Sequence, residues 1–488
     1  MKPQQFYIDG KWLSGYGDTS YELINPATEE PYARVCDAAV EDVKRAIAAA
    51  RRSFDDGVWR ETPLAERSEL LHELAEGLRQ RSDEIADIMI GCHGIDHSIL
   101  GYNRDAAIAN IDLYADEALR FPIDEPIAPF VMRGEGEWPG VVLNAISHRQ
   151  PVGVCGLIST WNFPLFITVN KIAPALAMGC SVVVKPSPLG PLIDLLIARV
   201  LDSLGLPVGV FNVVTGQSSE LGAELSTNPD VDMIGFTGSA QVGRALMSAA
   251  GASLKRLHLE LGGKSALLVC PDADLDAAVP IATRAVIMRA GQACAHLTRV
   301  LVPRELQGAL VEKMVASVEQ NARVGDPSDP QVTVGPLITA ERLDAVERLV
   351  NEARDDGAIV ACGGHRPEGT GRGFFYEPTV LTDVRTSMRI AQEEIFGPVV
   401  CVMPFDDLDE AVAIANDSEC GLSGGIVTSD TALAVDLAKR IRTGEVVIND
   451  GNHPNAPFGG FKQSGLGREM FPSGFEAFTE QQVISWPS

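Results

Sequence analysis

Residues 152–184, VGVCGLISTWNFPLFITVNKIAPALAMGCSVVV, decide the fold. Val152–Leu157 and Ser181–Val184 are short apolar runs that predict buried strands, and Lys171–Ala177 between them predicts a helix. The alternation continues with a helix at Leu192–Leu204, strands at Phe211–Val214 and Met233–Phe236, and a helix at Gln241–Ala250. This pattern predicts an α/β fold with a mostly parallel sheet, which binds ligands at the carboxyl ends of its strands.

The flanking sequence predicts a mainly helical amino-terminal region, an arm and a second α/β series. After short strands in Phe6–Asn25, helices are expected at Ala38–Arg52, from Pro63 to about Arg81 with Thr62 as N-cap, at Asp83–Gly91 and at Arg104–Arg120. The proline-rich Phe121–Trp138 predicts a linker into an extended arm at Val141–Arg149. The second series has strands at Ala266–Val269 and Arg299–Val302, helices at Leu275–Met288, Gln307–Gln320 and Ala340–Asp355, a loop from Asn449 and a final strand at Gln482–Trp486.

The 488-residue chain carries a net charge of −26, with 45% apolar and 22% charged residues. This composition is ordinary for a globular protein, and the negative charge argues against nucleic acid or an anionic membrane as a partner. The nine cysteines are scattered and form no CxxC, which favours reduced thiols and a cytoplasmic location. Met1–Gly10 lacks the apolar region of a signal peptide, and the longest apolar run, Ile172–Val184, is too short to span a bilayer.

Two stretches are candidates for covalent chemistry, MRAGQAC at 288–294 and RLHLELGGKS at 256–265. Cys294 would be the nucleophile, and Glu260 the base that activates it or a later water. They lie 294 − 260 = 34 positions apart, so the fold must bring them together. Two alternatives stay open: scattered cysteines are mostly buried and inert, and His296 would be the base of a cysteine hydrolase.

The signals for nucleotide binding are individually weak. There is no GxGxxG, and GGKS at 262–265 is not a phosphate loop because His258 stands in place of the upstream glycine. Phe236-Thr237-Gly238-Ser239 is either a phosphate site at a helix amino terminus or an ordinary strand–helix turn. Lys185 follows a strand, where it would meet a ribose or phosphate or would simply be solvated. Asn162 is either an oxyanion donor or a turn residue.

Seven motifs occur in one order: WNFP at 161–164, KPS at 185–187, FTGS at 236–239, LELGGKS at 259–265, GQAC at 291–294, EEIFGPV at 393–399 and PFGGFKQSGLGRE at 457–469. Together they resemble the NAD(P)-dependent aldehyde dehydrogenase superfamily, from about Phe6 to Thr479. The resemblance implies an α/β, aldehyde-dehydrogenase-like fold. It would have a Rossmann-like NAD(P)-binding domain at 1–122 and 149–258, an α/β catalytic domain at 259–448, and a small β oligomerisation arm at 123–148 and 470–488, with 449–469 as a returning loop.

The resemblance also implies the chemistry, the oxidation of an aldehyde to the carboxylic acid. Cys294 matches the nucleophile that forms a thiohemiacetal and then a thioester, Glu260 the base for hydrolysis, Asn162 the oxyanion donor and Lys171 a proton-relay residue. NAD is the implied cofactor, with NADP as the alternative, no metal is expected, and the assembly would be a homodimer or homotetramer. The matching cofactor contacts are Ile158, Ser159, Thr160, Trp161, Lys185, Ser187, Gly216, Gly222, Phe236, Gly238, Ser239, Val242, Leu261, Glu394 and Phe396.

Some positions depart from the family pattern. Pro188 stands where NAD-preferring members often have a ribose-binding glutamate, which leaves NADP open. Pro472 is aligned with a second carboxylate base, which places more weight on Glu260. The substrate tunnel is expected to be wide with a polar side, suited to a substituted or ring-bearing aldehyde. Its expected lining is Phe163, Asn170, Ala293, Ala295, Asn452 and Phe458.

Two other functions stay open. One is a CoA-acylating semialdehyde dehydrogenase, although such members commonly lack a glutamate at the position of Glu260. The other is a catalytically silent cofactor-binding paralogue, which would not need Cys294, Glu260 and Asn162 intact.

Overall fold

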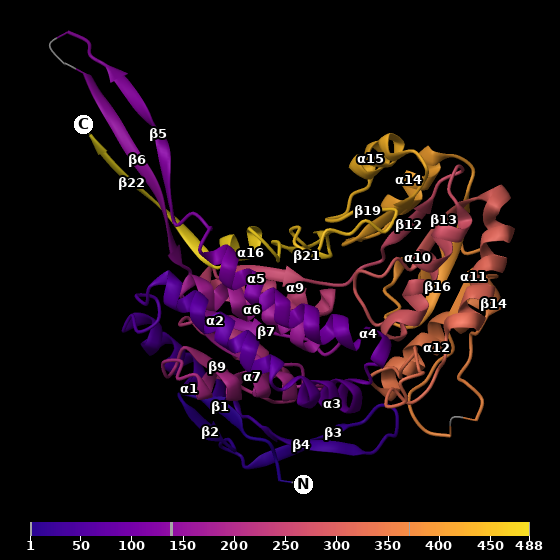
Figure 1. Cartoon of the computed structure of the whole chain (residues 1–488), viewed down its shortest axis with the longest axis horizontal. Coiled ribbons are helices and arrows are strands. Elements are labelled where there is room, and N and C mark those ends of the chain that lie inside the picture. Colours follow the sequence, from indigo (N-terminus) through magenta and orange to yellow (C-terminus); the bar gives the residue numbers. More distant parts are fainter. Residues whose placement is uncertain (1, 137–139, 370, 488) are drawn as a thin grey trace.

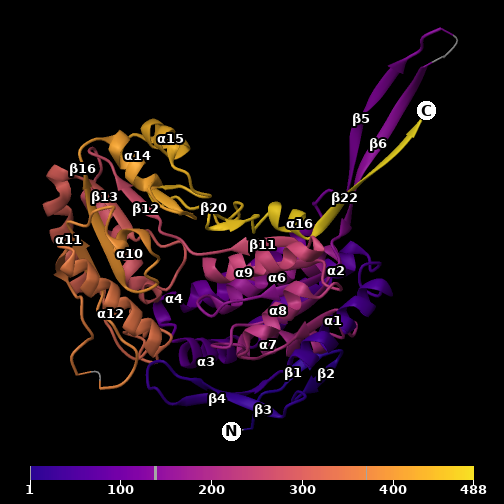
Figure 2. The ribbon, with the colours of Figure 1, turned by 180° about the vertical axis from the view of Figure 1, so that it is seen from behind.

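The computed structural model describes residues 2–136, 140–369 and 371–487. Met1, Trp138 and Ser488, which fall within ranges predicted above, lie outside the described residues. Most of the strands belong to two large sheets and a protruding arm, which Figures 1 and 2 show from opposite sides.

The first sheet contains β1 (Phe6–Ile8), β2 (Lys11–Leu13), β7 (Val154–Ile158), β8 (Ser181–Lys185), β9 (Phe211–Val213), β10 (Met233–Thr237), β11 (Arg256–Glu260) and β21 (Gly465–Leu466). Its order is β2-β1-β9-β8-β7-β10-β11-β21, and the pairs between β9 and β11 are parallel. The chain moves from β7 through β8 to β9 on one side and continues at β10 on the other. The topological switch therefore lies between β7 and β10, where open α/β sheets bind ligands.

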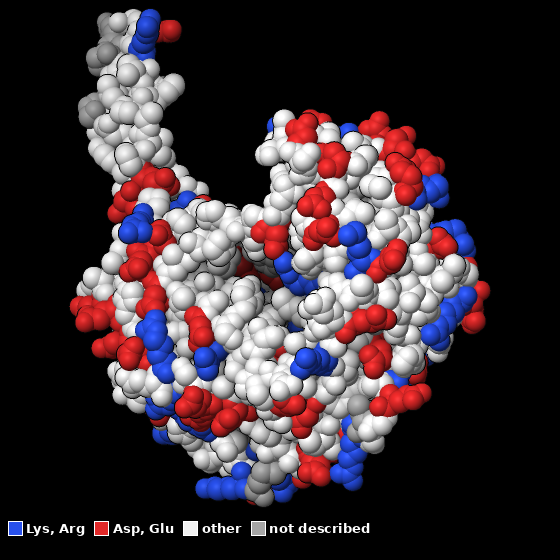
Figure 3. Space-filling model, turned by 45° about the vertical axis from the view of Figure 1, so that its right-hand side comes forward, with Lys and Arg blue, Asp and Glu red and all other residues white. Residues whose placement is uncertain are grey.

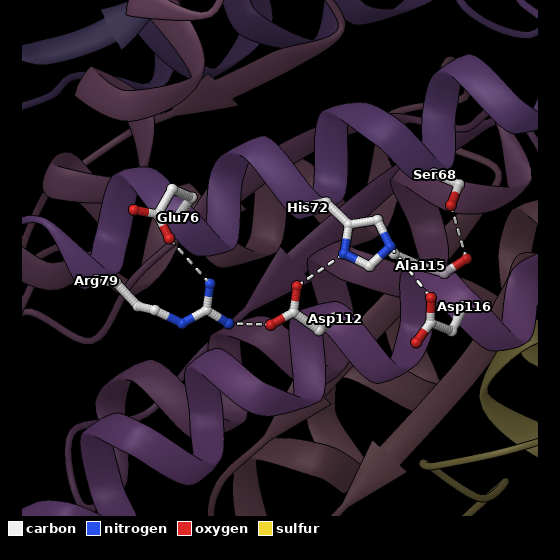
Figure 4. Close-up of polar contacts among 7 residues, drawn as sticks. All are labelled: Ser68, His72, Glu76, Arg79, Asp112, Ala115 and Asp116. Atoms are coloured by element: carbon white, nitrogen blue, oxygen red, sulfur yellow. Dashed lines mark hydrogen bonds and ion pairs between the residues drawn. The ribbon is translucent and has the colours of Figure 1, made fainter.

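Helices pack around this sheet: α1 (Val40–Asp55), α2 (Leu64–Arg79), α3 (Ser82–His93), α4 (His97–Gly101), a π-helical turn (Tyr102–Ala106), α5 (Ala107–Ala118), α6 (Pro164–Met178), α7 (Leu192–Ser203), α8 (Ser219–Thr227) and α9 (Ala240–Ala250). The predicted N-cap of α2 is wrong: Pro63 takes that position because its ψ of 140° is extended, and the helix begins one residue later. At the surface, His72 bridges α2 to α5, with its ring nitrogens 2.8 Å from Asp112 and 3.2 Å from Asp116 (Figure 4).

The second sheet contains β12 (Ala266–Val269), β13 (Arg299–Pro303), β14 (Ile359–Cys362), β15 (Thr379–Thr382), β16 (Val399–Phe405), β18 (Gly424–Val427) and β19 (Val447–Ile448). Its order is β14-β15-β16-β13-β12-β18-β19, and every pair except β14 with β15 is parallel. Its helices are α10 (Leu275–Ile287), α11 (Gln307–Asn321), α12 (Ala340–Asp355), α13 (Arg389–Gln392), α14 (Leu408–Asn416) and α15 (Thr431–Arg440). Two small sheets pair β3 (Thr19–Ile24) with β4 (Pro31–Asp37) and β17 (Cys420–Gly421) with β20 (Phe461–Lys462).

The arm is an antiparallel sheet of β5 (Asp124–Arg133), β6 (Gly140–Pro151) and β22 (Thr479–Pro487), which follows α16 (Ser473–Ala477). The predicted linker at Phe121–Trp138 is therefore wrong, because β5 pairs with β6 through most of that range. The prolines fit because β5 is an edge strand, and Pro129 lies in the register shift between Ile127 and Phe130. Most of the arm surface in Figure 3 carries no charged side chain.

Buried apolar side chains form one extended cluster around the first sheet and two around the second. Each sheet therefore has a core of its own, and residues at the carboxyl ends of their strands are held on rigid elements. No helix within the described ranges is long and apolar enough to cross a membrane.

Candidate active site

Cys294 and Glu260 are brought together by two different sheets. Glu260 ends β11 of the first sheet, and Cys294 lies in the loop that leads into β13 of the second. Gly263 packs so closely on the backbone carbonyl of Cys294 that a Cβ atom would not fit. Burial, followed by the charges of Glu394 and Glu260, raises the pKa of the Cys294 thiol to about 12. Nucleophile and base candidates therefore interact across 34 residues of sequence.

The turn before Cys294 has a left-handed backbone at three consecutive residues: Arg289 at φ 59°, Ala290 at 48° and Gly291 at 72°. Gly291 also lies against the carbonyl of Gly397, which leaves no room for a side chain. Gln292 anchors the turn, because its Nε2 donates to the carbonyl of Pro336 at 3.1 Å and its Oε1 accepts from the N–H of Ile338 at 2.9 Å. The strained backbone is thus held by buried hydrogen bonds.

Asn162 lies just before α6 and is 2% exposed. Its Nδ2 donates to the backbone carbonyl of Gln292 at 3.1 Å. Because a carbonyl only accepts, this bond fixes which end of the Asn162 amide carries the N–H groups. The second Nδ2 hydrogen has no acceptor among the described residues. It is available for a developing oxyanion, together with the backbone N–H of Cys294.

Behind Glu260 lies a buried cluster of charges. Lys171 Nζ is 2.7 Å from Glu469 Oε1, and the two side chains are 1% and 6% exposed. Glu260 is 4% exposed, and neither of its oxygens has a hydrogen-bond partner among the described residues. Burial raises the pKa of Glu260, and the Glu469 charge raises it further, while Lys171 and Arg468 oppose the shift. A carboxylate of raised pKa is a stronger base than an exposed one.

The alignment of Pro472 with a second carboxylate base is wrong. Pro472 is the N-cap of α16, and the carboxylate beside Glu260 belongs to Glu469. Glu469 is the last letter of the PFGGFKQSGLGRE motif, so the sequence contained the signal. His258, another neighbour, has Nε2 3.6 Å from Glu260 Oε1, and burial lowers its pKa to about 4, which keeps the ring neutral.

His296 receives no support as the base of a cysteine hydrolase. Its ring is buried, and its Nε2 has no hydrogen-bond partner among the described residues, Cys294 included. Burial, followed by the charge of Arg284, lowers the pKa of His296 to about 4.

The candidate cofactor residues gather around the switch point of the first sheet. Ile158 and Lys185 end β7 and β8, while Phe236 lies near the end of the parallel neighbour β10. Ser159, Thr160, Trp161 and Ser187 follow those strands, Gly216 follows β9, Gly222 lies in α8, and Gly238, Ser239 and Val242 open α9. Ser239 caps α9 by accepting from the N–H of Val242 at 3.4 Å, which leaves other donors at this helix end free.

Two observations test whether a dinucleotide fits here. Lys185 is buried, and among the described residues its Nζ bonds only to the carbonyl of Pro186, at 3.2 Å. Burial lowers the pKa of Lys185 to about 8, with Asp37 and Asp194 opposing. A buried ammonium without a bonded carboxylate suits a ribose hydroxyl or a phosphate. Gly222 leaves space as well, because a Cβ there would meet only Ile158, at 3.8 Å.

Glu394 and Phe396 bring the second half of the chain to the same place. Glu394 Oε1 accepts from the N–H of Gly263 at 3.2 Å, and burial raises its pKa to about 7. The ring of Phe396 meets that of Trp161 edge-on at 5.6 Å. Leu261, just beyond β11, donates its N–H to the carbonyl of Ser464 at 2.9 Å.

The residues expected to line the substrate tunnel differ in how exposed they are. Phe163 and Ala293 are buried, Ala295 and Phe458 are half-buried, and Asn452 is exposed. Asn170 is buried on α6, where its Oδ1 accepts from Asn110 Nδ2 at 3.2 Å. Tyr102, which the sequence did not single out, meets Phe163 edge-on at 6.1 Å and stacks on Phe166 at 5.5 Å. No motif marks Tyr102, because its contacts with these two rings depend on where the π-helical turn packs.

Comparisons with known proteins agree with this geometry. The sequence model of the aldehyde dehydrogenase family matches residues 12–484. A 3-succinoylsemialdehyde-pyridine dehydrogenase from a Pseudomonas species is 39% identical over 99% of this chain and 98% of its own. An aldehyde dehydrogenase from Mycobacterium tuberculosis in complex with NAD+ is 40% identical, with a TM-score of 0.93 over 99% of this chain and 98% of its own. A cysteine-to-alanine variant of aldehyde dehydrogenase C from Pseudomonas syringae, complexed with NAD+ and octanal, is 38% identical, with a TM-score of 0.92 over 99% and 96%. The chain therefore belongs to the aldehyde dehydrogenase family.

Proposed function

We propose that this aldehyde dehydrogenase uses NAD+ to oxidise an aldehyde to the carboxylic acid through a covalent intermediate on Cys294. The observation that carries the proposal is that the Asn162 amide bonds to the carbonyl of Gln292, two residues before Cys294, while the Glu260 carboxylate acts on the Cys294 thiol. Both solved relatives named above were captured with NAD+, and one also with an aldehyde.

In the first half of the reaction, the Cys294 thiol passes its proton to the Glu260 carboxylate, and its sulfur bonds to the aldehyde carbon, giving a thiohemiacetal. The charge that develops on oxygen is accepted by the free Nδ2–H of Asn162 and the N–H of Cys294. Bound NAD+ would supply the acceptor for the hydride that leaves that carbon. Lys185, the amino terminus of α9 and Glu394 would hold the cofactor. Once the hydride has left, a thioester remains on Cys294.

In the second half, Glu260 takes a proton from water, and the hydroxide attacks the thioester to release the acid and the Cys294 thiolate. Glu260 is suited to this role because its carboxylate is buried and has no hydrogen bond of its own among the described residues. Lys171 and Glu469 lie next to it and can pass the proton onward. A CoA-acylating reaction would not need Glu260.

For the substrate, we propose a substituted or ring-bearing aldehyde. The rings of Tyr102, Phe163 and Phe166 supply flat apolar surface, and Asn170 and Asn110 supply a polar side. A Pseudomonas relative is named for a pyridine-containing semialdehyde. Pro188 leaves use of NADP open.

The remaining proposals concern assembly and location. The arm exposes Phe130, Val131 and Trp486, at 65%, 60% and 45%, which favours a homodimer or homotetramer built through it. We divide the chain into an NAD(P)-binding domain (1–122, 149–258), a catalytic domain (259–448) and an arm (123–148, 470–488). The membership of the sheets supports this division, except that β11 of the first sheet extends past the boundary at 258 to Glu260. All nine cysteines are unpaired, which supports a cytoplasmic location.

The test is absorbance of reduced nicotinamide with NAD+ or NADP+ and a panel of aldehydes from short aliphatic to aromatic. Activity should need Cys294 and should disappear in Cys294→Ala, which keeps the fold. Turnover by Cys294→Ala would contradict the nucleophile, and turnover of only short unsubstituted aldehydes would contradict the substrate class.

A further inference from the structure

Arg289 is a buried cation in the turn before Cys294 that the reaction above does not use. The residue is 1% exposed. Its guanidinium donates to three backbone carbonyls: that of Asn162 from Nε at 3.0 Å, that of Gly94 from Nη1 at 3.3 Å and that of His93 from Nη2 at 2.7 Å. A side chain from the nucleophile turn is thus bonded to the backbone of the oxyanion asparagine, which lies 289 − 162 = 127 positions away.

The two terminal nitrogens of the Arg289 guanidinium bond to the carboxyl-terminal end of a helix. His93 ends α3, and Gly94 is its left-handed C-cap, so both carbonyls lie at the negative end of the helix dipole. These carbonyls stabilise a guanidinium that water does not reach. Burial lowers the pKa of Arg289 to about 10, with Asp96 opposing, so the group stays charged at neutral pH.

Asn162 is held by the same turn through a second bond. While its carbonyl accepts from Arg289, its Nδ2 donates to the Gln292 carbonyl at 3.1 Å. The adjacent carbonyl, of Trp161, is 2.9 Å from His93 Nδ1. Burial lowers the pKa of His93 to about 3, so the neutral ring carries its proton on Nδ1 to make this bond. The peptide and the amide of Asn162 are both tied to the turn that carries Cys294.

This support matters because the turn is strained. A left-handed backbone is unfavourable at a residue other than glycine, and Arg289 and Ala290 both adopt it. Gln292 ties the turn to Pro336 and Ile338, which lie in the chain segment of the second sheet. Arg289 makes the corresponding connection from the turn to the part of the molecule that is built around the first sheet.

We propose that Arg289 is a positioning residue for the oxyanion hole. Its guanidinium holds the backbone of Asn162 in a position from which the Asn162 amide and the Cys294 N–H can both donate to the carbonyl oxygen of the aldehyde. The inference rests on the proposed function of Cys294. Oxyanion donors act through position, and a displacement of about 1 Å can cost about 10² in rate. Arg289 itself touches no reacting atom.

A double-mutant cycle tests this. Arg289→Met, Asn162→Ala and the double variant are compared by kcat/KM for an aldehyde at saturating NAD+. If Arg289 acts through Asn162, Arg289→Met lowers kcat/KM by about 10- to 100-fold in the wild type but by less than about threefold in the Asn162→Ala background. Losses that multiply would overturn the proposal. If Arg289→Met does not fold, Arg289→Lys, which keeps the charge but loses the fork, takes its place in the cycle.

Arg299 provides a matched control. It is 2% exposed, and within the part of the chain that the structure describes its guanidinium likewise donates only to backbone carbonyls, those of Lys264, Ile414, Ala415 and Asp417. Any loss in Arg299→Met should multiply with that of Asn162→Ala, because it has no bond to that residue. The proposal would be overturned if the loss of kcat/KM in Arg299→Met shrank in the Asn162→Ala background as much as the loss in Arg289→Met does.

A second readout separates positioning from collapse of the turn. Alkylation of Cys294 by iodoacetamide needs no oxyanion hole, so its rate in Arg289→Met should stay within about twofold of wild type. An alkylation loss as large as the turnover loss would overturn the proposal. Dehydrogenase activity in Cys294→Ala would instead refute the proposed function. If Cys294→Ala is inactive but the losses of Arg289→Met and Asn162→Ala multiply, only the role of Arg289 is refuted.

Discussion

Replacing Lys171 with methionine should destabilise the protein far more than removing a lysine from an exposed ion pair. Lys171 is bonded to Glu469 at 2.7 Å, with 1% and 6% of the side chains exposed. Removing one partner of a buried pair leaves the other charge uncompensated, which typically costs about 3–5 kcal/mol. Glu260 is a second buried carboxylate beside Lys171, so the loss should lie within that range rather than below it.

The matched control is Lys313→Met. Lys313 bonds to Asp276 at 2.5 Å, but the side chains are 45% and 78% exposed, so the expected loss of stability is much smaller than that of Lys171→Met. A double variant, Lys171→Met with Glu469→Met, removes both charges of the buried pair. It should recover part of the lost stability, because neither charge of the pair is then left unpaired, and Arg468 still acts on Glu260.

The assay is urea unfolding followed by the fluorescence of the five tryptophans and by circular dichroism. A loss of about 3 kcal/mol corresponds to more than a hundredfold change in the ratio of folded to unfolded protein, since about 1.4 kcal/mol is tenfold. The reasoning is refuted if Lys171→Met and Lys313→Met unfold at the same urea concentration with the same slope.

Three further predictions concern single groups. Because the pKa of Cys294 is raised to about 12, alkylation of the cofactor-free enzyme by iodoacetamide should accelerate about tenfold per pH unit from 7 to 10; a plateau below pH 9 would contradict this. In Glu260→Gln, hydrolysis of the thioester should slow more than its formation, so stopped-flow absorbance should keep a burst of reduced cofactor; equal losses in burst and steady state would count against the assigned base. Burial raises the pKa of Asp194 to about 7, so its contribution to stability is full below about pH 4 and is lost as the pH rises through 7. Asp194→Asn should therefore lose less thermal stability than wild type between pH 5 and pH 8, and parallel losses would argue against this shift.

The strands and helices of the first sheet were predictable because their apolar runs are continuous. The predicted Ser181–Val184 and Met233–Phe236 each fall one residue short of β8 and β10. The strand β5 was not predictable in this way, because exposed residues and prolines are typical of a linker. It is a strand because it pairs with β6. Helix α8, with three buried residues, likewise gives a weak apolar signal.

The sequence by itself determined the candidate reactive groups: Cys294, Glu260 and Asn162 lie in motifs whose residues and order are specific to one family. Only the tertiary structure decided which groups surround them. Glu469, rather than a residue at position 472, faces Glu260, and Arg289 reaches the carbonyl of Asn162. The physical reason is that motifs record side-chain chemistry and local backbone shape. A hydrogen bond or charge interaction between distant residues exists only once two sheets have packed and excluded water, and that packing is not written in any short stretch of sequence.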